Sequence, residues 1–170
     1  MPASGDKIYA ADVDDLGDYT IRRPLVRLIQ QSAQSLTDNT ATAITFGASS
    51  EDIDTHGFHD TATNNSRITP TIAGYYLCTG ILWLGGATTL AQMWSAIYKN
   101  GASVLINRCK PDLANTTAPS VQVSTIVSLN GSTDYVELYA LQDDTGGAAR
   151  NTTTGAANAC TLEAIFLRPL

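Results

Sequence analysis

Basic residues are scarce in this chain of 170 residues. Ten lysines and arginines stand against 16 aspartates and glutamates, which gives a formal net charge of −6 and a pI near 4.6. A nucleic-acid-binding surface needs clustered Lys and Arg, whereas here they are spread along the sequence. We therefore expect no nucleic-acid partner.

Cysteine is also scarce, and the three cysteines match no metal-binding or redox spacing. Cys78 and Cys160 lie inside apolar segments, where a free cysteine commonly behaves as a small buried hydrophobic residue. We expect free cysteines, and one disulfide is the alternative.

Motifs that would mark a secreted protein or an enzyme are missing. The N-terminus, MPASGDKIYAADVDDL, has neither the basic nor the apolar region of a signal peptide, so we expect synthesis and assembly in a cytoplasm. There is no P-loop, G-x-G-x-x-G, HExxH or G-x-S-x-G motif. The only glutamates, Glu51, Glu137 and Glu163, suggest no catalytic pair. The sequence predicts no catalytic residue, no cofactor and no enzymatic activity.

The longest apolar run, RITPTIAGYYLCTGILWL at residues 67–84, is about long enough to cross a bilayer as a helix. Pro70, Gly74 and Gly80 disfavour a helix, and the β-branched and aromatic residues favour a strand. We expect no membrane partner. A strand with one face in solvent should alternate apolar and polar residues, so both faces of this one are predicted to be covered.

No segment shows the 3.6-residue period of a helix of ten or more residues. The expected strands are 25–34, 42–46, 68–71, 74–83, 91–99, 102–107, 120–129, 134–142 and 160–167. Asn100-Gly101 lies between two of them and is the signal of a type I′ hairpin, and Asn130-Gly131 lies in a longer loop. The pattern predicts an all-β, antiparallel sandwich or jelly roll of about eight to ten strands.

Alternation assigns the faces of the two strands around the second turn. The predicted core residues are Val121, Val123, Val127, Leu129, Val136, Leu138 and Ala140. The opposite faces carry Ile126, Tyr135, Tyr139 and Leu141 among polar residues. This is more apolar surface than a solitary sandwich exposes, and it has the composition of a subunit interface.

The one cluster of ligand-type residues is EDIDTHGFHD, residues 51–60. Asp52, Asp54, His56 and His59 are weak candidates for a transition-metal or calcium site. The spacing of a calcium-binding EF-hand is missing, and polar residues collect in loops in any case. We predict a solvated or interface loop and no metal.

Four aromatic residues at strand spacing, Tyr75, Trp83, Trp94 and Tyr98, favour a place in the core or in an interface. A sugar-stacking platform is the alternative.

Residues 1–24 differ from the rest of the chain, because aspartates come first, arginines follow and the apolar residues are isolated. Such a segment can bury little by itself. We predict an extended N-terminal arm followed by one domain, residues 25–170. The residues expected to anchor the arm to a larger particle are Ile8, Tyr9, Val13, Leu16 and Tyr19.

Four stretches, in order, resemble the jelly rolls of the complement globular-head and tumour-necrosis-factor superfamily. RITPTIAGYYLCTGILW resembles its central strand, AIYKNGASV its hairpin, VSTIVSLNGSTDYVELYA its strand–turn–strand, and CTLEAIFLRPL its closing strand, although Ala164 stands where that family usually has Gly. The residues that carry the match are Ile68, Ile72, Gly74, Tyr76, Leu129, Gly131, Asp134 and Val136.

The resemblance implies a threefold homotrimer with one sheet of each subunit packed at the axis. One face of 74–83 would then fill the sandwich through Tyr76, Cys78, Leu82 and the adjoining Leu84, and the other would meet neighbouring subunits. The interface residues this implies are Tyr75, Leu77, Ile81, Trp83, Ile126, Tyr135 and Tyr139.

Two departures narrow the function, since the chain has neither a collagen-like Gly-X-Y repeat nor a signal peptide. A short acidic arm before one Ala/Thr/Ser/Asn-rich jelly roll looks like the surface and fibre proteins of tailed bacteriophages. This implies a structural protein of the virion surface, made in the bacterial host cytoplasm: a capsid decoration or a head or tail fibre tip. Its arm would bind a capsid, tail or baseplate protein.

Two other functions stay open. The first is a receptor-binding module that holds a host-surface glycan or protein through the outer loops 48–65 or 142–155. The second is a polysaccharide depolymerase, which is the least favoured because no carboxylate pair is evident.

Overall fold

The computed structural model describes residues 23–86, 89–111, 118–155 and 157–170. The predicted arm, with its five anchoring residues, lies outside the described residues except for its last two positions.

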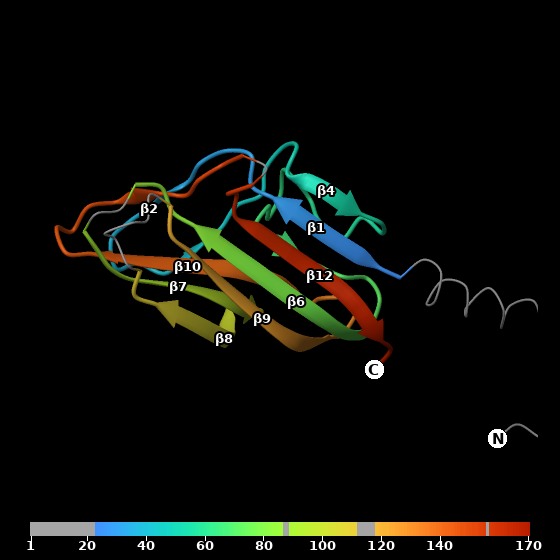
Figure 1. Ribbon diagram of the computed structural model, residues 1–170. Coiled ribbons are helices and arrows are strands. Elements are labelled where there is room, and N and C mark those ends of the chain that lie inside the picture. Colours follow the sequence, from blue (N-terminus) through green and yellow to red (C-terminus); the bar gives the residue numbers. More distant parts are fainter. Residues whose placement is uncertain (1–22, 87–88, 112–117, 156) are drawn as a thin grey trace, which may run out of the picture.

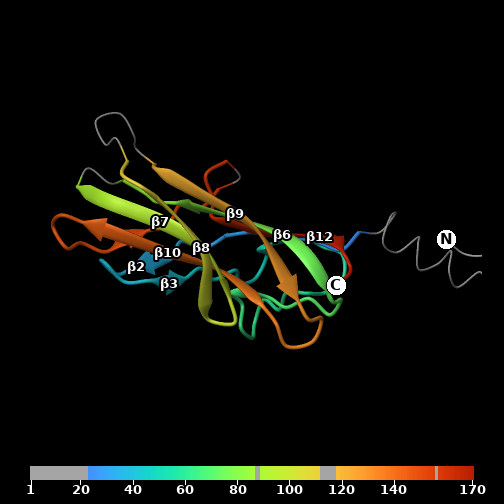
Figure 2. The ribbon, with the colours of Figure 1, turned by 90° about the horizontal axis from the view of Figure 1, so that it is seen from below.

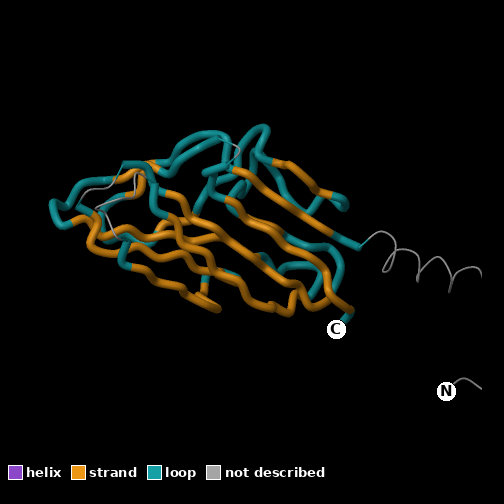
Figure 3. The backbone as a smooth tube through the Cα atoms, in the orientation of Figure 1, coloured by secondary structure: helices purple, strands orange, loops and turns teal. Residues whose placement is uncertain are grey.

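Within the described residues the chain forms strands and no helix (Figure 3). The strands are β1 (Leu25–Ile29), β2 (Ser35–Leu36), β3 (Thr42–Ala43), β4 (Glu51–Asp54), β5 (Arg67–Ile68), β6 (Gly74–Trp83), β7 (Leu90–Lys99), β8 (Ala102–Cys109), β9 (Ser120–Leu129), β10 (Val136–Asp144), β11 (Arg150–Asn151) and β12 (Thr161–Arg168). Every pairing between them is antiparallel. The predicted all-β antiparallel class is therefore confirmed.

Two sheets stack face to face (Figures 1 and 2). The front sheet has the order β4-β1-β12-β6-β9, and the back sheet has the order β3-β10-β7-β8 with β5 also paired to β10. Strands β2 and β11 form a small third sheet. Strands β9 and β8 are thus the edge strands on the same side of the sandwich.

The core lies between the inner faces of the two sheets, as the alternation predicts. Strand β6 alternates strictly between buried and half-buried residues, and its buried set includes Tyr76, Cys78 and Leu82. The predicted core residues of β9 and β10 are all at most 5% exposed. Gly80 within β6 leaves room for Leu138, because a Cβ at position 80 would lie 2.6 Å from the end of that side chain and would displace it.

Two Asn-Gly turns meet at one end of the sandwich. Asn100 and Gly101 have φ values of 52° and 79°, as the predicted type I′ hairpin requires. Asp134 joins the turns, since its carboxylate accepts a hydrogen bond of 2.7 Å from the Asn100 amide and one of 3.0 Å from the Asn130 backbone N–H. It also pairs with the Lys99 ammonium at 2.8 Å. Lys99 first and Asn100 second lower the pKa of Asp134 below its usual value.

The strands differ from expectation at several places: β3 and β5 are shorter than the expected 42–46 and 68–71, and the short strands β2 and β11 were not expected. The expected strand 25–34 ends at Ile29, and beyond it the side chain of Gln34 bonds the backbone of the 43–45 segment: its amide donates to Ala43 O at 2.9 Å and its carbonyl accepts from Thr45 N–H at 2.9 Å. Strand β4 forms within a segment expected to be a loop, because it pairs with β1 despite three exposed residues.

Candidate subunit interface

The outer face of the front sheet presents side chains in rows that the strand register fixes. On β6 this face carries the half-buried residues Tyr75, Leu77, Thr79, Ile81 and Trp83. Each has a partner on β9, and all except Trp83 also have one on β12. The rows therefore cross the sheet from β9 toward β1.

One row is apolar across four strands. Ile126, Leu77, Ile165 and Leu25 are consecutive register partners from β9 through β6 and β12 to β1. Ile126 is 57% exposed and the other three are half-buried. We call these four residues the apolar row. Such a continuous stripe is what a partner protein can bury.

The next row is polar, and its charges are paired. Thr79 hydrogen-bonds Ser124 at 3.0 Å, and the Arg27 guanidinium lies 3.1 Å from Glu163 and 3.3 Å from Asp52. These ion pairs are partly exposed, and a pair of that kind adds little to the stability of the single chain. In a contact surface, their fixed geometry can select one register.

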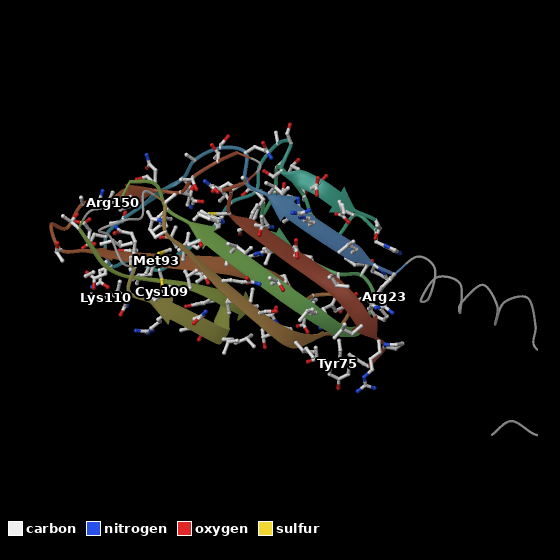
Figure 4. The ribbon with its side chains drawn as sticks, in the orientation of Figure 1. Arg23, Tyr75, Met93, Cys109, Lys110 and Arg150 are labelled. Carbon is white, nitrogen blue, oxygen red and sulfur yellow. The ribbon has the colours of Figure 1, made fainter. Side chains whose placement is uncertain are left out.

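The row beyond the polar row is mixed, since Thr161 lies between Ile81 on β6 and Ile29 on β1, and Gln122 is the β9 partner of Ile81. Tyr75 lies at the other end of the face (Figure 4), and the Arg168 guanidinium lies 4.6 Å from the centre of its ring. The face therefore carries one continuous apolar row, an ion-paired polar row beside it and a mixed row beyond that.

Sequence reasoning missed the interface candidates Leu25, Ile29 and Ile165. Their strands alternate strictly between half-buried and buried residues up to Phe166, so the same alternation argument applied to 25–29 and 160–167 would have found them.

The structure separates the seven predicted interface residues. Five lie on the front sheet, whereas Tyr135 and Tyr139 lie on the outer side of the back sheet. The rings of Tyr139 on β10 and Tyr98 on β7 stack there with their centres 3.9 Å apart, and Tyr135, which directly precedes β10, has the Arg67 guanidinium 3.9 Å from its ring centre. Burial raises the pKa of Tyr139. One flat contact surface cannot contain all seven residues.

The aromatic set considered as a sugar platform divides in the same way. Tyr75 and Trp83 lie on the front sheet, whereas Trp94 and Tyr98 lie on the back sheet, where Trp94 is only 5% exposed. The four rings therefore do not form one platform.

Strand β8, which runs beside β9 at the edge of the sandwich, exposes apolar side chains on both sides of the back sheet, since Leu105 pairs with Ile97 of the core and Ile106 pairs with Ala96 of the outer side. Val104, Leu105 and Ile106 are consecutive on β8 and are 44%, 42% and 37% exposed. The Asn107 amide donates to Gln122 O on β9 at 2.6 Å and fastens the two edge strands together. An exposed apolar edge strand invites pairing or docking with another chain.

The weak metal candidates each have a protein partner instead. Asp52 pairs with Arg27, and the Asp54 carboxylate accepts the backbone N–H groups of His56 and His59. The buried His59 ring contacts Glu51 Oε1 at 2.9 Å and Asn65 O at 3.2 Å. Among the described residues, no three His, Cys, Asp or Glu side chains are grouped to hold a metal ion.

The loops at the far end of the sandwich are held by an ion pair between Asp144 and Arg150 (Figure 4). Thr89 donates its hydroxyl to the Asp144 carboxylate at 2.7 Å, and Arg150 donates to the same oxygen and to Gly86 O at 2.8 Å. These contacts, with Thr89 first, lower the pKa of Asp144 to about 2. We call this group the Arg150 clasp.

The cysteines do not supply a reactive thiol in the core. All three are free, and burial raises the pKa of Cys78 and of Cys160 to about 12. In the part of the chain that the structure describes, no helix has the length and apolar character needed to cross a membrane.

Comparisons with known proteins bear on the fold. No protein-family model and no curated protein matches this chain. The crystal structure of murine APRIL at pH 5.0 matches with a TM-score of 0.62 and 9% identity, over 85% of this chain and 99% of that chain. The globular domain of zebrafish complement 1qA protein matches with a TM-score of 0.58 and 11% identity, over 87% of this chain and 99% of that chain. The described chain therefore has the jelly-roll fold of the tumour-necrosis-factor and complement globular-head proteins, as the sequence motifs predict.

Proposed function

We propose that this chain is a non-enzymatic structural protein of a phage virion. It acts as a homotrimeric jelly roll on the particle surface, as a capsid decoration or a head or tail fibre tip, and residues 1–24 tether it to a capsid, tail or baseplate protein. The observation that carries the trimer is the apolar row across the outer face of the front sheet. The virion assignment is supported by the acidic arm and the composition of the sequence.

A ring of subunits follows from the two different apolar surfaces of one chain. The apolar row lies on the front sheet and Val104, Leu105 and Ile106 lie on β8 of the back sheet, and the two surfaces adjoin at β9, which carries Ile126 of the row. A contact between unlike surfaces is heterologous, and it forms a closed ring when the rotation between copies closes. When the β8–β9 edge of one subunit packs on the front-sheet face of the next, every subunit of the ring uses its edge in one contact and its face in another.

The proposed tether leaves the sandwich at one end. Arg23 and the C-terminus lie together at that end, whereas Arg150 lies at the other (Figures 1 and 4). In a particle-bound trimer the loops around Arg150 would then point away from the particle. Three arms on one trimer would strengthen attachment through avidity.

The trimer is tested by light scattering with two matched variants. Leu77→Asp places a charge in the centre of the apolar row. This variant should be monomeric, because burying an unpaired carboxylate in an interface has a large desolvation free energy. Ala41→Asp places the same charge on an exposed position just before β3, at the edge of the back sheet opposite β8, and should leave the trimer intact. A wild-type monomer, or a Leu77→Asp trimer, contradicts the proposed interface.

The tether is tested separately by deleting residues 1–24. The shortened protein should remain a soluble trimer but should no longer enter virions when it is expressed during infection. Incorporation at the level of the full-length chain would refute the tether while leaving the trimer standing.

A second candidate function is receptor binding through residues 142–155, and the Arg150 clasp favours it. The clasp holds these loops in place at the end away from Arg23, where a host surface would be met. Ala149→Arg adds a bulky side chain at an exposed position of this loop and should block adsorption to cells. Ser132→Arg, at an exposed position of the turn that follows β9, is the control, because this turn belongs to neither candidate binding loop. Unchanged adsorption by Ala149→Arg would count against this function.

A further inference from the structure

A cleft of about 240 Å³ lies between the loop 57–64 and β5, away from the front-sheet face and the β8–β9 edge. Its polar lining residues are His59, Asp60, Thr63, Asn64, Arg67 and Thr69. Pockets for drug-sized ligands measure about 300–1,000 Å³, so this cleft suits a smaller molecule.

The shape of the cleft is set by the backbone. Asp60 Oδ1 accepts the N–H groups of Ala62 at 2.8 Å and Thr63 at 3.0 Å, which closes a tight turn. Asn64 continues it with a φ of 54°, and its carbonyl accepts the Arg67 N–H at 2.9 Å. Below the turn, the buried His59 is fixed between Glu51 and Asn65. A site built in this way is organised before a ligand arrives.

The polar groups of the cleft keep unused hydrogen-bonding capacity. The backbone bonds of the turn use only Oδ1 of Asp60, and they hold its pKa below the usual value, so the carboxylate is ionised with Oδ2 available. Arg67 is steadied by Glu137 at 3.4 Å through its Nε and by the Tyr135 ring. Within the described residues its two terminal nitrogens, like the side chains of Asn64 and Thr69, make no hydrogen bond.

This set of groups selects a class of ligand. An apolar molecule would displace the water around the Asp60 carboxylate and the Arg67 guanidinium. It could not replace the hydrogen bonds of that water, so its binding would be unfavourable. A charged molecule would meet one partner and one like charge, since Asp60 and Arg67 both line the cleft. A neutral molecule whose hydroxyls both donate and accept can satisfy the carboxylate, the guanidinium and the amide together.

We propose that this cleft binds one neutral sugar residue, with Asp60 accepting from its hydroxyls and Arg67 and Asn64 completing the ring of hydrogen bonds. The inference rests neither on the trimer nor on the virion, because one chain alone builds the cleft.

The test is a titration of the full-length protein with methyl glycosides of glucose, galactose, N-acetylglucosamine and rhamnose, followed by amide chemical shifts in NMR. At least one glycoside should give saturable shifts confined to residues 57–69. Asn64→Gly removes the amide while keeping the positive φ that glycine tolerates, and Asp60→Asn keeps the turn acceptor but removes the charge. Each should weaken binding about tenfold or more.

The matched control is Asn39→Gly, a second asparagine with positive φ, at 49°, in a loop that does not line the cleft. It should leave the affinity unchanged. The proposal is overturned if none of the four glycosides gives saturable shifts, if the shifts lie elsewhere, or if Asp60→Asn binds as well as the native chain. Light scattering on the same samples reports the oligomer independently, so loss of the trimer and loss of sugar binding are distinguishable.

Discussion

The glycines of the two Asn-Gly turns, Gly101 and Gly131, allow a paired test of whether the 131 turn packs against residues 72–73 in solution. Gly101 and Gly131 have φ values of 79° and 71°, in the left-handed region. They differ in their surroundings. A Cβ on Gly101 would meet nothing closer than 3.9 Å, whereas one on Gly131 would lie 2.4 Å from the Ala73 nitrogen and 2.8 Å from the Ile72 carbonyl carbon. Both are backbone atoms, so neither can move aside as a flexible side chain would.

The expected losses follow from this difference. Gly101→Ala should lower the free energy of unfolding by about 1–2 kcal/mol, the usual penalty for an L-residue in the left-handed region. Gly131→Ala carries the same penalty and forces the 131 turn away from residues 72–73. Overpacking of this kind adds roughly 1–3 kcal/mol, which gives a total of about 2–5 kcal/mol.

The assay is urea unfolding followed by tryptophan fluorescence, with all variants at one protein concentration because the stability of an oligomer depends on it. Equal losses for the two variants would show that strain in φ is the whole effect and that the close approach of the 131 turn to residues 72–73 is not maintained in solution. A larger loss for Gly101→Ala would refute the reasoning outright.

Three further predictions concern acid stability, thiol reactivity and the core. Because the pKa of Asp144 is lowered to about 2 from 3.8, the stability that the Arg150 clasp supplies is complete above about pH 4 and is lost as the pH falls through 2; unfolding of Asp144→Asn should depend less on pH in that interval. Cys109, which is half-buried, should react with a thiol reagent in the native protein, while the two buried cysteines should react only in urea. Leu82→Ala should lower the free energy of unfolding by about 2–5 kcal/mol because Leu82 is fully buried, whereas Leu105→Ala should change it little in monomeric protein.

Much of the fold could be predicted from the sequence because the signals are local. Every one of the nine expected segments contains a strand or part of one, and the alternation on 120–129 and 134–142 finds the residues of the core. The expected exposure of Leu141 is wrong, because that side chain is only 8% exposed and packs with Trp94 and Ala96 in a second cluster. The two-residue hairpin at Asn100-Gly101 is encoded by the residues that tolerate positive φ. Strand β4 could not be predicted from its sequence, EDID, because that sequence is polar. It forms a strand because it pairs with β1.

The candidate interface could be predicted only in part, for a physical reason. A period of two separates the two sides of one strand, but it does not say to which sheet that strand belongs. Alternation alone therefore predicts one interface for Tyr135, Tyr139, Tyr75 and Leu77, although β10, which Tyr135 directly precedes, lies in the back sheet and β6 lies in the front sheet. The rows of the interface depend on pairing between distant strands, such as Leu25 with Ile165, and pairing of that range leaves no mark in the local pattern.

The two edges of the sandwich differ in how far they are covered by the chain itself. This difference favours a closed ring of subunits over a twofold dimer. On the β4 side, the loop after the edge strand folds back, with His59 bonded to Glu51 and Asp54 to the loop backbone. On the β8–β9 side, three consecutive apolar residues stay exposed. If that edge paired with the same edge of another copy, a twofold dimer would result and the front-sheet face would remain uncovered. If the β8–β9 edge of one subunit packs on the front-sheet face of its neighbour, both surfaces are buried. Only a closed ring buries both surfaces in every subunit.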